Sequence, residues 1–504
     1  MDALLIGFGA LDIYRLSFML IGTVAGIWIG ALPGLGPSAA TAIILPFTYY
    51  MDPLSSILLI ASIYSAAGYS GSVSSILINV PGEATSAATA FDGYPMARQG
   101  KARVALGLSL MASLVGALAG VAVLAFLSGP FITIALLFSP AEYFGLAVLG
   151  LVAVSAAGGG DVYKGLIMCC VGVIVSFVGV DAVIGVPRYT FGITSLQGGV
   201  SLVAVMVGLF AISEVIGMML DDGSVAPSGK LEGSLWDGMV DTFRYPRVLT
   251  ATTVLGLLIG IIPGIGSTAG NFICYEIARR MSRTPELFGH GAPEGIIAPE
   301  TSNNATIGSS LVPALTLGIP AGATSAMLLI VLTIQGIVPG PSLFRTQPEL
   351  VYGFYVGLFV ASIMFFVVGA VLTNSFALIT TARNEILAPL IMVASLVGAY
   401  AYQRSVLDVF IAIVFGFAGY FLRRYRFPVV GIVMGMVLGS LAEVSFHQAL
   451  MMAAGSYSIF FNRPITAMLL GLALAIAVWP LVRKLIGLRR RPMEGLAETP
   501  GQKT

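Results

Sequence analysis

Residues 30–40 read GALPGLGPSAA, and they place Pro-Gly-x-Gly where the preceding apolar helix would be expected to continue. Residues 260–270 read GIIPGIGSTAG and repeat this pattern 230 positions later. Pro33 and Pro263 each remove a backbone donor, and the glycines that follow permit backbone angles that other residues resist. We therefore predict two membrane helices that break in the same way.

The composition indicates a membrane protein. The 504 residues are 57% apolar and 10% charged, whereas soluble proteins carry roughly 25% charged residues. Apolar runs at 104–128, 198–220, 350–380 and 464–482 are long enough to cross about 30 Å of lipid as helices, and they lack the alternation of a β-barrel. We predict an all-α polytopic protein with roughly 10–15 crossing or half-crossing segments. The net charge of +1 argues against a nucleic-acid partner.

A second pair of similar segments indicates an internal duplication. NVPGEATSA at 79–87 resembles GIPAGATSA at 318–326, an offset of 239 residues, and both pairs occur in the same order. Basic residues indicate the cytoplasmic side. No basic residue lies in 49–53, the turn after the first Pro-Gly-x-Gly motif, whereas three lie in 278–283, the turn after the second.

After the second pair of similar segments the distribution of basic residues is reversed. Three basic residues lie in 96–103, in the first half, and one lies in 339–349, in the second. This predicts an inverted-topology repeat with broken helices, as secondary transporters use to expose one central site to either side. The expected division is a first repeat at 1–220, a cytoplasmic linker at 221–247, an inverted second repeat at 248–488 and a cytoplasmic tail at 489–504.

Small residues recur at the spacing with which membrane helices pack. These sets are Gly22, Gly26 and Gly30; Gly116 and Gly120; Gly256, Gly260 and Gly264; and Gly431, Gly435 and Gly439. We interpret them as packing positions.

Irregular backbone at membrane depth persists only against protein or a wet cavity, so we expect the four breaks to surround one site. Each break is followed by Ser or Thr, which favour helix starts, and a restarted helix directs free N–H groups toward an anion such as a carboxylate. The alternative is that the breaks are ordinary turns outside the membrane. The predicted substrate-binding residues are Gly34, Gly36, Ser38, Asn79, Gly82, Thr85, Ser86, Gly264, Gly266, Ser267, Thr268, Asn303, Asn304, Gly322, Thr324 and Ser325.

Ionisable residues within membrane spans are expensive and are candidates for function. Glu83 lies in a break whose counterpart in the second half is Gly322, and it is the main candidate for binding a coupling ion. Glu300, Thr301 and Ser302, in the polar run 299–310, are further candidates, and Glu214 is a weaker one. The three cysteines lack metal-ligand spacing. We expect no structural metal and no cofactor apart from a coupling sodium ion or proton.

The chain resembles the large membrane subunit of the tripartite tricarboxylate transporters, the TctA family. The similarity covers nearly the whole length and rests on five segments: GALPGLGPSAATAIILPFTYYMDP, INVPGEATSAATAFDGYPMARQGKA, GVPRYTFGI, IIPGIGSTAGNFICYEIARRMS and PETSNNATIGSSLVPALTLGIPAGATSA. Phe446-His447 stands where the resemblance leads us to expect a basic residue, so the resemblance does not name the particular carboxylate.

The resemblance implies a secondary transporter in the bacterial inner membrane that uses an ion gradient to take up organic carboxylates, including di- and tricarboxylates such as citrate. It also implies two protein partners, namely a small four-helix membrane subunit and a periplasmic solute-binding protein. Membrane lipid surrounds such a subunit.

Other classes fit less well. GYSG at 68–71 matches rhomboid serine proteases and GGGD at 158–161 matches presenilin-like aspartyl proteases, but four-residue matches in a Gly-rich chain are weak. A serine nucleophile needs a nearby base, and only His290 and His447 are available. A channel with broken helices is the remaining alternative, and conductance above carrier turnover would reveal it. We therefore expect no enzymatic activity.

Overall fold

In a computed structural model the chain is built almost entirely of helices. The structure describes residues 2–32, 36–157, 162–181, 185–220, 232–262, 267–376 and 384–485. The predicted tail, 489–504, and the first part of the predicted linker, 221–231, lie outside these ranges.

The first half contains ten α-helices, one short hairpin and several tighter or wider helical turns among its described residues. In chain order they are α1 (Asp2–Gly9), α2 (Ile13–Gly30), α3 (Pro37–Ile44), η1 (Leu45–Tyr50), α4 (Pro53–Ile78), η2 (Ala84–Ser86), α5 (Ala87–Met96), η3 (Ala97–Lys101), α6 (Ala102–Ala135), α7 (Pro140–Ala157), α8 (Val162–Ser176), β1 (Gly179–Val180), β2 (Pro187–Arg188), η4 (Thr194–Leu196), α9 (Leu202–Met206), the π-helical η5 (Val207–Ile212) and α10 (Ser213–Leu220). The two strands pair antiparallel, with Gly179 opposite Arg188.

The remainder begins within the predicted linker. Its elements are α11 (Leu235–Asp241), η6 (Thr242–Arg244), α12 (Pro246–Ile261), α13 (Ser267–Met281), η7 (Pro285–Leu287), α14 (Glu294–Leu317), α15 (Ala323–Ile334), α16 (Pro341–Thr346), α17 (Pro348–Leu372), η8 (Thr373–Ser375), α19 (Asn384–Gln403), α20 (Val406–Arg424), α21 (Val430–Met452), α22 (Ile459–Asn462) and α23 (Pro464–Leu485). The linker thus includes one short helix, α11, which packs on α6.

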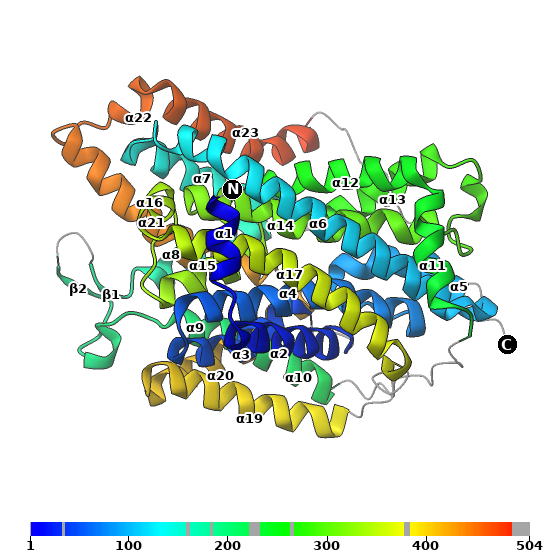
Figure 1. Cartoon of the computed structure of the whole chain (residues 1–504). Coiled ribbons are helices and arrows are strands. Elements are labelled where there is room, and N and C mark those ends of the chain that lie inside the picture. The colour runs from blue at the N-terminus through cyan, green and yellow to red at the C-terminus, as the bar shows by residue number, and fades with distance from the viewer. Residues whose placement is uncertain are drawn as a thin grey trace.

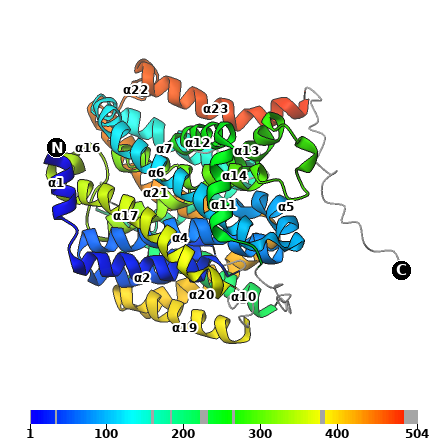
Figure 2. The same cartoon turned by 45° about the vertical axis from the view of Figure 1, so that its right-hand side comes forward.

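The helices have the lengths and composition of membrane spans. Within the described residues, seven helices are long and apolar enough to cross a membrane, and six further apolar helices are shorter. This confirms the predicted all-α polytopic class. Figures 1 and 2 both place α4, α6, α14 and α17 in the middle of the molecule, with α19 and α20 on one side and α22 and α23 on the other.

The helix pairings of the first half recur in the second. Helix α2 packs on α4 as α12 packs on α14, and α6 packs on α14 as α17 packs on α4. Helix α8 contacts α21 as α20 contacts the π-helical segment η5. These matching helix contacts are consistent with the duplication inferred from the two short motifs.

The ends of the helices have the arrangement that an inverted repeat predicts. The side-chain nitrogen of Gln335, at the end of α15, donates to the carbonyl oxygens of Thr48 at 2.6 Å and Met51 at 3.3 Å. Gln99 donates to the carbonyl oxygen of His290 at 2.8 Å. The segment that follows the first break of each half therefore lies beside the segment that follows the second break of the other half. Which end faces the cytoplasm stays a prediction.

The predicted glycine sets are packing positions. A Cβ at Gly26 of α2 would lie 2.4 Å from the Ile63 carbonyl oxygen of α4, and one at Gly256 of α12 would lie 2.7 Å from the Ser302 carbonyl oxygen of α14. A Cβ at Gly435 of α21 would lie 2.2 Å from the Cys169 carbonyl oxygen of α8. Such close approach maximises van der Waals contact between helices in lipid. Gly264 lies outside the described residues.

Gly116 of α6 offers a direct test of this packing. A Cβ there would lie 2.2 Å from the Thr301 carbonyl oxygen of α14, so Gly116→Ala forces the two central helices apart. We expect a loss of about 1–3 kcal/mol of stability, as for other overpacked cores, measured as a lower thermal midpoint in detergent. Gly129→Ala in the same helix is the control, because no described atom lies within 4 Å of its Cβ position. Equal midpoints for the two variants would contradict the packing.

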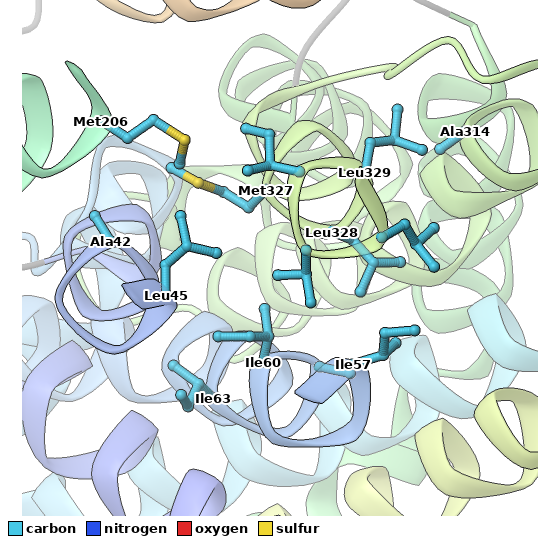
Figure 3. Close-up of a cluster of buried hydrophobic side chains, with 14 of the residues drawn as sticks. Ala42, Leu45, Ile57, Ile60, Ile63, Met206, Ala314, Met327, Leu328 and Leu329 are labelled. Atoms are coloured by element: carbon cyan, nitrogen blue, oxygen red, sulfur yellow. The ribbon is translucent and has the colours of Figure 1, made fainter. Parts of the chain in front are cut away.

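Apolar side chains hold the helices that follow the breaks against α4. The largest buried cluster includes Leu45, Ile60 and Met206 from the first half, with Met327 and Leu328 from α15 of the second. Figure 3 shows Ile57 and Ile60 of α4 on the side toward Leu328 of α15, and Ile63 on the side toward Leu45. The restarted helices α3 and α15 are therefore fixed in one core shared by both halves.

Candidate substrate cavity

A cavity of about 580 Å³ is lined by residues from all four helix breaks and from both halves of the chain. The breaks at the two Pro-Gly-x-Gly motifs contribute Gly36 and Ser38 at the start of α3, and Ser267 and Thr268 at the start of α13. Gly36 is the extended residue that precedes α3. The predicted Gly34, Gly264 and Gly266 lie outside the described residues.

The breaks in the second pair of similar segments, 79–87 and 318–326, have matching backbone geometry. Helix α4 ends at the left-handed Asn79, with φ of 59°, and α14 ends at Gly318, with φ of 71°. These positions correspond in the two repeats, and Asn and Gly are the residues that most readily end helices in this way. Glu83 and Gly322 also correspond, and each is the extended residue before the next helical segment.

From these breaks, Gly82, Glu83, Thr85 and Gly322 line the cavity. Other predicted residues of the motifs do not. Asn79 is an exposed helix end, and Ser86 is buried with no partner for its hydroxyl among the described residues. Ser325 holds its break in shape, since its Oγ accepts from the N–H groups of Ala321 at 2.9 Å and Gly322 at 3.1 Å. The side chain of Thr324 is not among those described.

The polar run on α14 reaches the cavity further along than predicted. Thr306 and Ser310 line it, whereas Thr301, Ser302, Asn303 and Asn304 are buried against neighbouring helices. The Nδ2 of Asn303 donates to the Gly68 carbonyl oxygen of α4 at 3.1 Å, and that of Asn304 donates to the Glu300 carbonyl oxygen at 3.3 Å. Thr301 donates to the Ile297 carbonyl oxygen at 2.7 Å. In this structure these residues connect helices.

Glu83, the main coupling-ion candidate, and Glu300, a further one, occupy different environments. Glu83 lines the cavity, accepts a hydrogen bond from Thr85 Oγ1 at 3.0 Å, and lies beside Gly36 of the first break. Glu300 is only 1% exposed and is not part of the lining. Its carboxylate lies among hydroxyl groups of α5 and α6.

The sequence interpretation missed an ion pair on the cavity wall. Arg423, at the end of α20, pairs with Glu214 of α10, and both line the cavity. Its second guanidinium nitrogen donates to the Leu209 carbonyl oxygen at 3.0 Å. By position, Arg423 resembles the basic residues that mark a cytoplasmic loop, and Glu214 is the weaker candidate for function named from the sequence. Among the described lining residues, Arg423 is the one basic side chain.

The π-helical segment η5 positions this pair. Its wider turns place Phe210 on the cavity and leave the Leu209 carbonyl oxygen able to accept from Arg423 and from Ser213. π-Helical turns occur frequently at functional sites. Helices are recognised in a sequence by the α-helical period of 3.6 residues, so the pattern does not reveal a π-helical segment.

In the GYSG motif, the serine hydroxyl binds backbone carbonyl oxygens among the described residues. Ser70 is buried in α4, and its hydroxyl donates to the Gly26 carbonyl oxygen of α2 at 3.1 Å. The GGGD motif at 158–161 lies outside the described residues. No group of three or more His, Cys, Asp or Glu side chains that could hold a metal ion occurs in the part of the chain that the structure describes.

Residues 16–435, which include all four breaks and Arg423, match the tripartite tricarboxylate transporter TctA family. The chain belongs to this family. TctA is a family of transporters and not of enzymes, so this TctA-family chain is a multi-pass membrane subunit of a transporter that has further subunits. The resemblance inferred from the motifs is thereby confirmed.

Two relatives of this TctA-family chain come from Agrobacterium vitis. An uncharacterized 52.8 kDa protein in the TAR-I ttuC' 3' region is 35% identical over 477 residues, which is 94% of this chain and 95% of the relative. An uncharacterized protein in the TAR-II ttuC' 3' region is 34% identical over 227 residues, or 45% of this chain and 94% of the relative. No solved structure matches the chain.

Proposed function

We propose that the chain is the large membrane subunit of a binding-protein-dependent secondary transporter that takes up organic carboxylates, di- or tricarboxylates such as citrate, together with a cation. The observation that carries this proposal is the cavity, which is lined by residues from four helix breaks, two in each half of the chain. Its volume lies within the roughly 300–1,000 Å³ usual for small-molecule sites.

The charges on the cavity wall support an anionic substrate. Helix starts present free N–H groups and a partial positive charge, and α3, α13 and α15 all begin at this cavity. Arg423 adds a full positive charge and a planar set of donors suited to carboxylates. Glu83 and Glu214 oppose it, so a substrate anion has to displace or neutralise one of them.

The proposed partners are a small four-helix membrane subunit and a periplasmic binding protein that delivers the substrate. The tripartite character of the family supports three components. The repeat of helix pairings supports alternating access, in which the two halves expose the shared cavity to either side in turn. The proposed location is a bacterial inner membrane, with the C-terminus in the cytoplasm and sodium or a proton as the coupling ion.

Reconstitution tests this function. The neighbouring genes should encode a four-span membrane protein and a secreted binding protein, and thermal-shift screening of the binding protein with di- and tricarboxylates names the ligand. Proteoliposomes containing both membrane subunits should then accumulate that radiolabelled carboxylate when the binding protein and an inward sodium or proton gradient are both present. Uptake that continues without the binding protein, or that never exceeds equilibrium, contradicts the proposal.

A further inference from the structure

Glu300 lies in a cluster of hydroxyl groups from three other helices. Thr89 Oγ1 of α5 donates to one carboxylate oxygen at 2.5 Å, and Ser109 and Ser113 of α6 donate to the other at 3.1 Å each. Ser72 of α4 lies 2.7 Å from the hydroxyl of Ser109. The four hydroxyl residues are fully buried, and Glu300 is 1% exposed.

The cluster contains a carboxyl group without a positively charged partner among the described residues. No Lys, Arg or His among the described residues forms an ion pair with Glu300, although eight such pairs occur elsewhere in the described chain. Burying an uncompensated carboxylate in a membrane protein costs several kcal/mol or more. Either a proton or a bound cation has to balance this charge.

The arrangement of oxygens favours a cation. A protonated carboxyl group needs one acceptor for its hydrogen, whereas four hydroxyl groups surround Glu300, and a hydroxyl oxygen is free to bind a cation when its hydrogen points to a helix carbonyl. Ser72 already has such a contact, with the Tyr69 carbonyl oxygen at 2.7 Å. Carboxylate and hydroxyl oxygens are ligands for hard cations. One carboxylate matches a single positive charge.

We infer that Glu300 binds a monovalent cation, sodium, together with the hydroxyl oxygens of Ser72, Thr89, Ser109 and Ser113. The site joins α4, α5, α6 and α14, which include helices on both sides of a break.

The site is connected to the substrate cavity by two helices. Thr89 of α5 lies four residues after Thr85 of the preceding turn η2, and Thr306 is less than two turns beyond Glu300 on α14; Thr85 and Thr306 both line the cavity. Sodium would therefore fix α5 against α6 and α14 beside the cavity. This coupling role depends on the proposed transport function, whereas sodium binding itself does not.

Thermal unfolding of the purified full chain in detergent tests the binding directly. The midpoint is measured from 0 to 200 mM NaCl, with choline chloride keeping the ionic strength constant, and without substrate or partners. Because a ligand that binds only the folded state stabilises it by mass action, sodium should raise the midpoint of the wild type by several degrees. Glu300→Gln should remove this dependence, and Ser113→Ala should shift it to severalfold higher sodium concentration.

Glu142→Gln is the matched control. Glu142 is also a buried carboxylate with hydroxyl partners, but Arg463 pairs with it at 2.8 Å. This variant should keep the sodium dependence of the wild type even if its midpoint is lower. The inference is overturned if sodium and choline give the same wild-type midpoint, or if Glu300→Gln and Ser113→Ala both respond to sodium as the wild type does. A midpoint that depends on pH alone would assign a proton to Glu300 instead. Loss of uptake with sodium binding intact would contradict only the transport function.

Discussion

Replacing Arg423 with Gln is expected to lower carboxylate uptake about tenfold to hundredfold at subsaturating substrate. This range corresponds to the roughly 1.5–3 kcal/mol that a hydrogen bond to a charged group contributes. Arg423 is the one basic side chain among the described residues of the cavity wall. In the structure it binds the Glu214 carboxylate and the Leu209 carbonyl oxygen, so a carboxylate already occupies its donors.

The partner variant should have the opposite effect. If the substrate carboxylate exchanges with Glu214, Glu214→Gln removes a competing negative charge and should lower the KM for uptake severalfold. Initial rates across substrate concentrations separate KM from the maximal rate, and Arg423→Lys keeps the charge but loses the planar donors. If both Arg423→Gln and Glu214→Gln reduce uptake and the amount of folded protein equally, the pair is only structural, and our interpretation of Arg423 is wrong.

Gly322→Leu should abolish uptake while the protein still folds. Gly322 has an extended backbone, with φ of −171°, which any residue can adopt, and no described atom lies within 4 Å of its Cβ position. Since Gly322 lines the cavity, a larger side chain there takes up the space of the substrate. We expect Gly322→Ala to retain measurable uptake and Gly322→Leu to lose more than nine-tenths of it.

Gly82 provides the contrast for this experiment. It also lines the cavity, but a Cβ there would lie 2.5 Å from the Gly30 carbonyl oxygen and 2.9 Å from the Gly71 Cα. Gly82→Ala should therefore lower the thermal midpoint, whereas Gly322→Leu should leave it nearly unchanged. A low midpoint and low folded yield for Gly322→Leu would show that its backbone has no free space, and would contradict the cavity geometry.

The sequence predicted those parts of the fold that follow from local chemistry. Proline and glycine within a helix lower its stability, so the breaks near Gly36 and Gly82 could be located from the amino-acid sequence alone. Glycines four residues apart indicated the packing faces of α2 and α12. Once the repeat was recognised, Glu83 and Gly322 could be assigned to equivalent positions.

The details that the sequence did not predict depend on how distant helices cross. The partners of Glu300 come from residues about 190 to 210 positions away, and no local pattern pairs them. Asn303 was expected to face the site, but α4 crosses α14 at this point, so its side chain binds the Gly68 carbonyl oxygen. Arg423 lies at the end of its helix, where a basic residue ordinarily indicates a cytoplasmic loop.

The most direct test of the account is thiol labelling at one position from each break. In a variant lacking Cys169, Cys170 and Cys274, single cysteines replace Ser38, Thr85, Ser267 and Gly322, and each is treated with the hydrophilic reagent MTSES. Cysteines at Ala40 and Ala326, which are 0% and 2% exposed, serve as unreactive controls. We predict that all four break positions react, and that the carboxylate selected by the binding protein slows each reaction. Four positions that do not react, or that react at rates the substrate leaves unchanged, would contradict a single substrate cavity built from the four breaks.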